Sequence, residues 1–202
     1  ISDIAFTDSV KAIQARKGSR RIYAQMEKNG SWQTDITPEL AGFIAAQRSF
    51  FLGTASANGQ PYIQHRGGPP GFIKVIERKT LAFADYKGNR QFITQGNLTE
   101  NAKAFIFLID YMNRTRIKIW GRASVVDDQP QLLSGLMPSR DEYKARAEQV
   151  LIVTVEAWDI NCPQHIPQRI DREDVDKLLQ QRDQRIAELE LQPSPEQATG
   201  GG

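Results

Sequence analysis

The spacing of hydrophobic residues changes near residue 50. Before that point apolar side chains such as Leu40 and Ile44 recur at three- to four-residue intervals, which is the period of an amphipathic helix. We predict one helix over residues 35–48, in which Thr37 is the capping residue. A shorter helix is expected over residues 8–16, where the helical spacing is weaker.

After residue 50 the pattern predicts short strands. The runs FFLGTAS and PYIQHR are separated by Asn58-Gly59, a dipeptide that favours a β-hairpin because both residue types tolerate positive φ. Successive side chains of a strand point to opposite faces. In the second run we therefore expect Tyr62, Gln64 and Arg66 on one face and Ile63 and His65 on the other.

The remaining strands follow in close succession. FIKVIE and TLAFAD read as a second hairpin, and RIKIWGRASVV and VLIVTVEAWDI as two long strands. The run AFIFLIDY is nearly all apolar, which predicts a central strand buried on both faces. Residues 88–99 are expected to form a loop with one helical turn, and residues 129–149 short helices broken at Pro138.

A strongly helical pattern resumes after Pro167. Helical spacing groups its apolar residues, with Arg182 among them, into a narrow stripe: Val175, Leu178, Leu179, Arg182, Ile186 and Leu189. The stripe has two interpretations, a helix packed on the rest of the domain or a helix that crosses to a second subunit. The final segment, LQPSPEQATGGG, has the composition of a disordered tail.

These elements define the expected fold class. Six or more strands joined by hairpins, with helices at the periphery, predict a mainly β protein built on a closed or nearly closed antiparallel barrel. One domain is expected over residues 1–190, followed by the tail 191–202. Within it we expect N-terminal helices over 8–48, a barrel core over about 50–160 and a C-terminal helix over 171–190.

Composition narrows the possible functions. The chain has 202 residues, of which 40% are hydrophobic and 25% charged, and a formal net charge of +2. Because Lys and Arg are spread along the chain, we expect no nucleic-acid partner. No apolar run approaches the roughly 18 residues of a membrane span, and no signal peptide opens the sequence, so a cytoplasmic protein without a membrane partner is expected. With one cysteine and two histidines, neither a disulfide nor a metal site is expected.

Two segments combine cations with glycine. Tyr86-Lys87-Gly88-Asn89-Arg90-Gln91 leaves a strand and turns at Gly88, which offers backbone N–H groups and two cations in a small volume. Such a loop suits a phosphate group, although solvated surface is the alternative. His65-Arg66-Gly67-Gly68-Pro69-Pro70-Gly71-Phe72 has three glycines that permit close approach of a ligand to the backbone. Its alternative interpretation is an irregular turn.

A third candidate lies on a strand. In Arg116-Ile117-Lys118-Ile119-Trp120 the alternation places Arg116, Lys118 and Trp120 on one face. Two cations and an indole on one face suit either solvent or a ligand wall.

Taken together, these segments resemble the flavin-binding split barrels related to pyridoxamine 5′-phosphate oxidase. The resemblance covers roughly residues 40–160 and implies an antiparallel split β-barrel of the FMN-binding type. It further implies a homodimer with FMN at the subunit interface, and a small-molecule substrate or an electron donor such as NAD(P)H. The cofactor-binding residues implied are His65, Arg66, Gly67, Gly68, Phe72, Tyr86, Lys87, Asn89, Arg90, Gln91, Arg116, Lys118 and His165.

The segment after the last expected strand bears on the cofactor and on the substrate. By similarity, Asn161-Cys162-Pro163-Gln164-His165-Ile166 follows the last barrel strand near the cofactor, where His165 is either a donor to the flavin or a structural residue. Cys162 is expected to be inert. The longer basic C-terminal segment of the oxidase is missing and Arg169 is its one remnant, which puts pyridoxamine phosphate in doubt as substrate.

No residue stands out as an obligatory acid or base. An FMN-dependent oxidoreductase is therefore the leading hypothesis, because the flavin itself carries the chemistry. A non-catalytic module that binds flavin or haem is the alternative, with His65 or His165 as candidate haem ligands. A barrel without a cofactor that acts as an assembly partner is a third.

Overall fold

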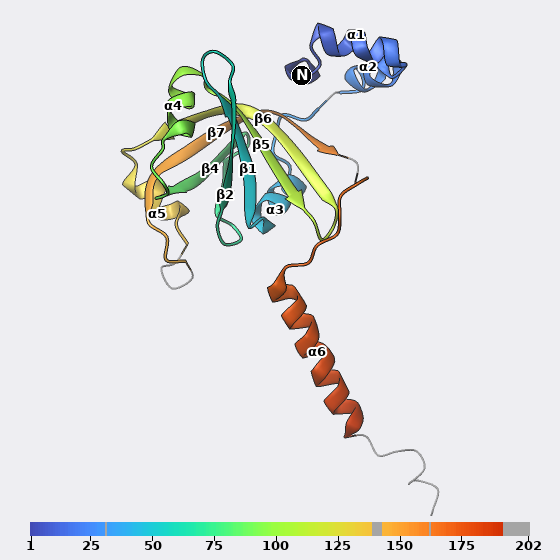
Figure 1. Ribbon diagram of the computed structural model, residues 1–202, viewed down its shortest axis with the longest axis vertical. Coiled ribbons are helices and arrows are strands. Elements are labelled where there is room, and N and C mark those ends of the chain that lie inside the picture. The colour runs from blue at the N-terminus through green and yellow to red at the C-terminus, as the bar shows by residue number, and fades with distance from the viewer. Residues whose placement is uncertain (31, 139–142, 162, 192–202) are drawn as a thin grey trace, which may run out of the picture.

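The computed structural model describes residues 1–30, 32–138, 143–161 and 163–191. Seven strands form one antiparallel sheet in the order β2-β1-β5-β6-β7-β4-β3 (Figure 1). The strands are β1 (Ser49–Ala55), β2 (Pro61–Gly67), β3 (Ile73–Glu77), β4 (Thr80–Tyr86), β5 (Lys103–Asp110), β6 (Thr115–Val126) and β7 (Ala147–Asn161). The helices are η1 (Ser2–Ile4), α1 (Asp8–Lys17), α2 (Arg20–Lys28), α3 (Pro38–Ala46), α4 (Ile93–Glu100), α5 (Pro130–Leu136) and α6 (Arg172–Glu190).

The sheet curls into a split barrel. Every neighbouring pair of strands is antiparallel, and β6 and β7 are long enough to serve both halves. The two ends of the strand order are not joined by a ladder. Instead, Arg66 of β2 forms an ion pair with Asp85 of β4. A side-chain contact therefore connects the two halves at the split, and the predicted fold class is confirmed.

The core fills the inside of this barrel. Phe50 has a 1% exposed side chain and contacts the rings of Phe72 and Phe83, with centroids 5.9 and 5.0 Å away. Alternate residues of β5 and β6, including Leu108 and Ile119, point into the same cluster. Burying side chains of this size stabilises the fold by about 1.5–3 kcal/mol each.

The sequence located most elements correctly. The helix of residues 8–16 is α1, and it ends at Gly18, whose φ of 84° is left-handed. In α3 the Thr37 hydroxyl accepts a hydrogen bond from the Leu40 amide at 3.2 Å, which confirms the predicted cap. Strands β1 and β2 form the predicted hairpin, and the alternation along β2 is as expected. In its turn only Gly59 adopts positive φ, since the connection is longer than two residues.

Three expectations need correction. Residues 88–99 contain a full helix, α4, rather than one turn. Strand β5 is fully buried on one face only, because Phe105 and Phe107 on its other face are half-buried. The helix α2 was not predicted at all.

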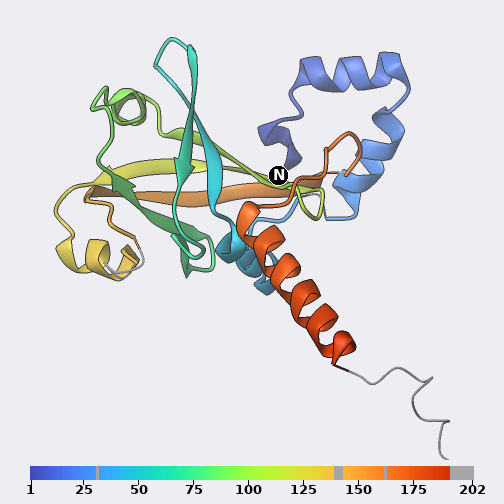
Figure 2. The same ribbon diagram turned by 60° about the horizontal axis from the view of Figure 1, so that its bottom comes forward.

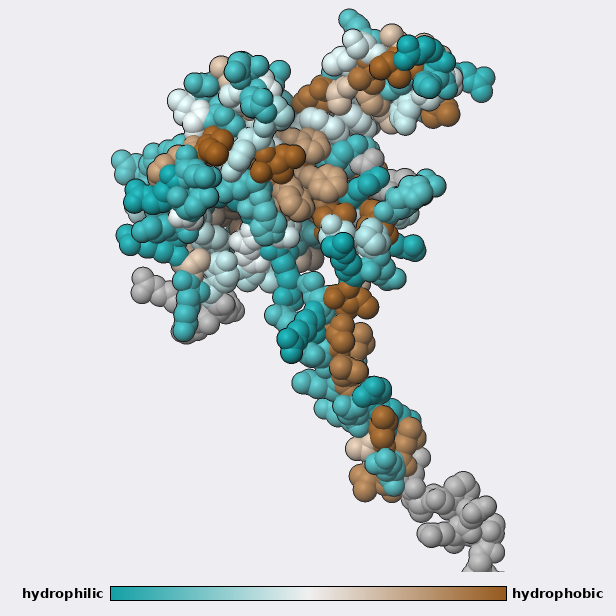
Figure 3. Space-filling view, viewed as in Figure 1, coloured by the Kyte–Doolittle hydropathy of each residue, from teal (hydrophilic) through white to brown (hydrophobic). Residues whose placement is uncertain are grey.

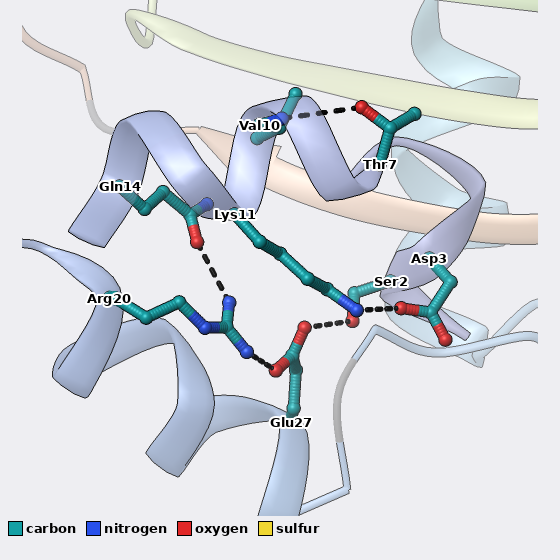
Figure 4. A network of polar contacts seen from close by, with 8 residues as sticks. All are labelled: Ser2, Asp3, Thr7, Val10, Lys11, Gln14, Arg20 and Glu27. Atoms are coloured by element: carbon teal, nitrogen blue, oxygen red, sulfur yellow. Dashed lines mark hydrogen bonds and ion pairs between the residues drawn. The ribbon is translucent and has the colours of Figure 1, made fainter. Parts of the chain in front are cut away.

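The network around Arg20 shows what holds α2. Its guanidinium donates to Gln14 Oε1 at 2.8 Å and pairs with the Glu27 carboxylate, which also accepts from Ser2 (Figure 4). The hydrogen bond from Arg20 lowers the pKa of Glu27. These contacts link η1, α1 and α2 into one unit, which meets the barrel where Trp32 stacks on Trp120 at 4.5 Å.

The C-terminal helix stands apart from the barrel. Figures 1 and 2 show α6 projecting away from the sheet, and none of its residues is buried. The interpretation that this helix packs on the domain is therefore wrong, while crossing to a second subunit remains a prediction. The expected tail lies mostly outside the described residues, as does Cys162. Among the described helices, none is both long and apolar enough to cross a membrane.

Candidate functional site

A small pocket lies at the split of the barrel. Its walls come from β2, β4, the start of β7, the loop after β4 and the first turn of α4. Its volume is about 50 Å³, which exceeds the ~10–15 Å³ needed for one water molecule but falls far below the ~300 Å³ of a typical small-molecule site. The pocket can therefore hold a phosphate-sized group, and the rest of a larger ligand must lie outside it.

Arg66 is held in place at the inner wall. Its Nη1 donates to Asp85 Oδ1, and Gln149 Nε2 donates to Asp85 Oδ2 at 2.8 Å. The side chains of Arg66 and Asp85 are only 14% and 15% exposed. A buried guanidinium requires such a partner, because an isolated buried charge is costly. The three residues thus form a chain that fixes the guanidinium before any ligand arrives.

Two of the residues that line the pocket each have a buried polar atom without a partner in the described part of the chain. Arg66 Nε and Tyr86 Oη are buried and form no hydrogen bond with any described residue. Burial raises the pKa of Tyr86, and the electrostatic interaction with Tyr143, whose ring lies 5.2 Å away, raises it further. Because buried polar groups are almost always paired, the orphaned Arg66 Nε beside the pocket indicates a missing acceptor. The Tyr86 ring packs against the cluster of Ala84, Leu136 and Val150.

The opposite wall is the N-terminus of α4. Ile93, Thr94 and Gln95 line the pocket, and no described side chain caps the helix at Phe92. The first backbone N–H groups of a helix have no intrahelical acceptor and carry a partial positive charge, which favours anions. The α4 terminus is therefore a second source of donors for the same ligand group.

Side-chain hydrogen bonds position α4. Thr94 Oγ1 donates to Gln64 Oε1 of β2 at 2.8 Å, and Asn97 Nδ2 donates to Thr54 Oγ1 of β1 at 3.0 Å. Thr94 and Asn97 are both buried. These contacts lock the helix terminus against the strand that carries Arg66.

The loop before α4 has an unusual backbone. Arg90 and Phe92 adopt positive φ, 60° and 53°, a conformation that costs energy in residues other than glycine and is common at binding sites. The Arg90 guanidinium lies 5.7 Å from the centre of the Phe92 ring. Asn89 and Gln91 bond to each other twice, at 3.1 and 3.2 Å. The predicted basic loop is thus an ordered pocket wall.

A larger, open hollow adjoins the glycine-rich segment. It measures about 660 Å³ and is lined by His65, Gly67, Gly68, Pro69 and Pro70, together with Arg48, Tyr143 and Glu173. The loop expected to face a ring system thus borders a space of suitable size. Arg48 at its edge pairs with Glu173 at 2.8 Å, and this hydrogen bond raises the pKa of Arg48.

The structure brings together some predicted residues. The phosphate-sized pocket collects Arg66, Tyr86, Asn89, Arg90 and Gln91. Lys87 is adjacent but does not line it, and its backbone N–H donates to Arg146 O at 2.8 Å. Five of the predicted residues therefore share one small volume.

Four predicted residues lie elsewhere. Phe72 is 3% exposed and belongs to the core, where its ring approaches so closely that a Cβ on Gly68 would lie 2.7 Å from it. Arg116 and Lys118 are on the outer face of β6, where Lys118 pairs with Asp159 at 3.4 Å. His165 is exposed and lines neither hollow.

Sequence reasoning also missed functional neighbours. Asp85, Gln149 and the α4 terminus are as close to the pocket as the predicted residues. A carboxylate at the end of the apolar run TLAFAD is a usable signal, because an acid that follows buried strand residues needs a partner. Nothing in the sequence identifies Arg66 as that partner.

The fold and the pocket define a class: a split barrel with a small pocket, lined by Arg66 and Arg90, where its two halves meet. The chain belongs to the pyridoxamine 5′-phosphate oxidase family, whose model matches residues 36–162, well over half of the chain.

Solved structures with a similar fold share little sequence. HupZ from Group A Streptococcus is 20% identical with a TM-score of 0.48, and the match covers 67% of this chain and 99% of that one. A putative pyridoxamine 5′-phosphate oxidase from Lactobacillus delbrueckii is 15% identical, with 63% and 95% covered and a TM-score of 0.48. An FMN-binding protein from Syntrophomonas wolfei is 12% identical, with 73% and 97% covered and a TM-score of 0.47. No curated protein matches the chain.

Proposed function

We propose that this protein is an FMN-binding flavoprotein of the oxidoreductase type. The observation that carries the proposal is the phosphate-sized pocket at the barrel split, which Arg66, Arg90 and the α4 terminus line and where Arg66 Nε is a buried donor without a partner among the described residues. A phosphate monoester bears nearly two negative charges and three acceptor oxygens, so it matches this set of donors. Membership of the pyridoxamine 5′-phosphate oxidase family supports the same assignment.

The phosphate and the ring of the ligand would occupy two different spaces, the phosphate-sized pocket and the larger hollow. Arg66 Nε, Arg90 and the α4 amides would hold the phosphate, and Tyr86 Oη would donate to it or to the adjoining chain. The ring would lie along Gly67 and Gly68, which border the 660 Å³ hollow. The flavin supplies hydride or electron transfer when bound. The protein's share is to hold the phosphate, orient the ring and exclude water.

We further propose a homodimer with the cofactor at the subunit interface. The ring hollow is open to solvent, and His65 in its wall forms an edge-to-face contact with Phe51 at 5.7 Å. A ligand of this size needs most of its surface covered, and a second subunit would supply the missing wall. Arg116 and Lys118, on the outer face of β6, would reach a flavin only in such a partner. NAD(P)H is the proposed electron donor.

The direct test is the absorbance spectrum of the purified protein, followed by acid release and identification of any chromophore. We expect FMN, one per chain, with bands near those of free flavin. Arg90→Ala should lose it, whereas Arg16→Ala, which removes an exposed arginine of α1, should retain it. A haem spectrum, or a colourless protein that takes up no added FMN, would contradict the proposal.

A further inference from the structure

The helix α6 carries an apolar stripe with no partner among the described residues of its own chain. Five large side chains are 37–54% exposed: Val175, Leu178, Leu179, Ile186 and Leu189. They recur at helical spacing on one side, while α6 is tethered to the domain only near its base, where Arg48 pairs with Asp171 and Glu173. Helical stability in proteins comes mainly from packing of such a face. The stripe therefore needs an apolar surface against which it can pack.

The outer face of the barrel offers an apolar surface of its own. The register places His65, Phe51, Phe107 and Lys118 in one row across β2, β1, β5 and β6, and Ile63, Gly53, Phe105 and Trp120 in the next. Ile63 is 69% exposed and Phe51 is 36% exposed. We call this surface, defined by Phe51, Ile63, Phe105 and Phe107, the outer face.

The stripe and the barrel's exposed apolar residues lie on the same side of the molecule. In Figure 3 hydrophobic residues gather over the middle of the barrel and along α6, both facing the viewer. The helix itself runs away from the sheet of its own chain (Figure 2). One additional molecule on that side would meet both surfaces.

Charge favours the barrel rather than another α6 as the surface that receives the stripe. Arg182 lies within the stripe and close to the middle of the 19-residue helix. A two-fold pairing of α6 with its copy would therefore bring two Arg182 guanidinium groups together, whether the helices run parallel or antiparallel, and like charges in contact are unfavourable. Pairing of stripe with stripe is thus disfavoured.

The charge of the barrel around the outer face is opposite to that of α6. The helix α6 carries six acidic and four basic side chains. The strands bordering the outer face carry Lys103, Arg116 and Arg122, which form no ion pair with any described residue. An acidic helix flanking a basic face adds electrostatic attraction to apolar contact.

We propose that α6 is an exchanged arm, whose stripe packs on the outer face of a second copy of this chain. In a two-fold assembly each chain gives one arm and receives one, so both exposed surfaces are covered. The inference concerns assembly, goes beyond flavin binding, and does not depend on which cofactor the barrel holds.

The test begins with the mass of the full-length protein in solution, measured by light scattering across a concentration series. We expect a dimer, twice the 22.8 kDa chain mass. The double variant Leu179→Glu/Ile186→Glu should weaken dimerisation at least 100-fold. The matched control Gln180→Glu/Gln184→Glu adds the same charge to the opposite side of α6 and should change it less than twofold. Circular dichroism confirms that both variants fold.

Cross-linking then identifies the receiving surface. In a Cys162→Ser background, chains with Ile63→Cys are mixed with differently tagged chains with Leu179→Cys, and disulfides between the two tags are expected. A monomeric wild-type protein, equal dimerisation of the two double variants, or cross-linking of Leu179→Cys chains only to one another would overturn the proposal. FMN content is measured on the same samples, so loss of flavin from an intact dimer bears on the proposed function alone.

Discussion

Arg66 meets two demands that oppose each other. It must be buried to act in a low-dielectric pocket, and a buried guanidinium needs a counter-ion. Asp85 supplies that counter-ion and is itself held by Gln149. The carboxylate keeps Arg66 in position, but its negative charge also lies beside the proposed phosphate. The pocket is therefore preorganised at some cost in affinity.

Replacing Asp85 separates these two effects. Asp85→Asn keeps an oxygen for Arg66 but removes the charge, so FMN should bind several-fold more tightly, since a nearby like charge costs on the order of 1 kcal/mol in a solvated setting. Asp85→Ala removes the positioning as well and should bind FMN more weakly than Asp85→Asn. Fluorescence titration with FMN measures both. Weaker binding by Asp85→Asn than by the wild type would contradict this expectation, because it would show that the negative charge of Asp85 is needed to position Arg66 more than it repels the phosphate.

Tyr86 gives a test that separates binding from stability. Its hydroxyl is buried without a partner, so Tyr86→Phe should leave the free energy of unfolding at neutral pH unchanged or slightly higher. If the hydroxyl donates to the flavin, FMN affinity should fall several-fold in the same variant. Denaturant unfolding and FMN titration provide the two readouts. Unchanged FMN affinity would remove Tyr86 from the site.

The burial of Tyr86 also predicts how the stability of the protein depends on pH. Burial raises the pKa of Tyr86 in the folded state above its usual value of 10.0. Above about pH 10 the unfolded chain loses this proton first, so the free energy of unfolding falls as pH rises through the folded-state pKa. Tyr86→Phe should make that alkaline decline less steep. Equal slopes for the two proteins above pH 10 would contradict the burial of this hydroxyl.

At the scale of elements, strands were easier to predict than helices. The period-2 pattern of PYIQHR and RIKIWGRASVV reflects faces that are buried and exposed in turn, and the structure keeps that alternation. The α4 segment ITQGNLTE has no comparable stripe. Its helix is positioned by Thr94 and Asn97, which bond to strands distant in sequence. Such contacts are invisible without the fold.

Replacement by alanine should have opposite effects on stability at two glycines. A Cβ on Gly121 would lie 2.3 Å from the Thr154 carbonyl oxygen, where β6 and β7 shift register, so Gly121→Ala should destabilise the protein by about 1–3 kcal/mol. Gly42 in α3 has open space around its Cβ position, and Gly42→Ala should stabilise by about 0.5–1 kcal/mol. Denaturant unfolding of both variants checks the pair. Equal effects would mean that β6 and β7 approach less closely than described.

At the scale of the whole molecule, the barrel carries two helical appendages. The candidate site could be predicted in part, because Arg66 and the loop of Lys87 to Gln91 flank strands that the sequence identified. The role of Phe72 could not be assigned, because the sequence alone does not distinguish a loop phenylalanine that faces a ligand from one that is buried in the core. The role of Lys118 was ambiguous for a related reason. The alternation shows that its side chain points away from the core, but the sequence does not show whether solvent, a ligand or another part of the protein covers that face. Here Trp32 covers part of it.

The N-terminal helices should detach without unfolding the barrel. They meet it through Phe6, Trp32 and Trp120, with ring centroids 5.1 and 4.5 Å apart. Trp120→Ala removes the surface on which Trp32 stacks, so amide hydrogen exchange over residues 8–28 should accelerate, while residues 104–108 of β5 stay protected. Ile22→Ala, at a 69% exposed position of α2, serves as the control. Unchanged exchange in Trp120→Ala would show that another contact holds these helices.

The pocket at the barrel split is proposed to bind the phosphate of a flavin. The most direct measurement compares the dissociation constants of FMN and riboflavin, which differ only in that phosphate, for the wild type and Arg90→Ala. We expect the wild type to bind FMN at least 100-fold more tightly than riboflavin, and Arg90→Ala to lose most of this preference while its riboflavin affinity changes little. Equal affinity of the wild type for the two flavins would contradict phosphate binding by this pocket.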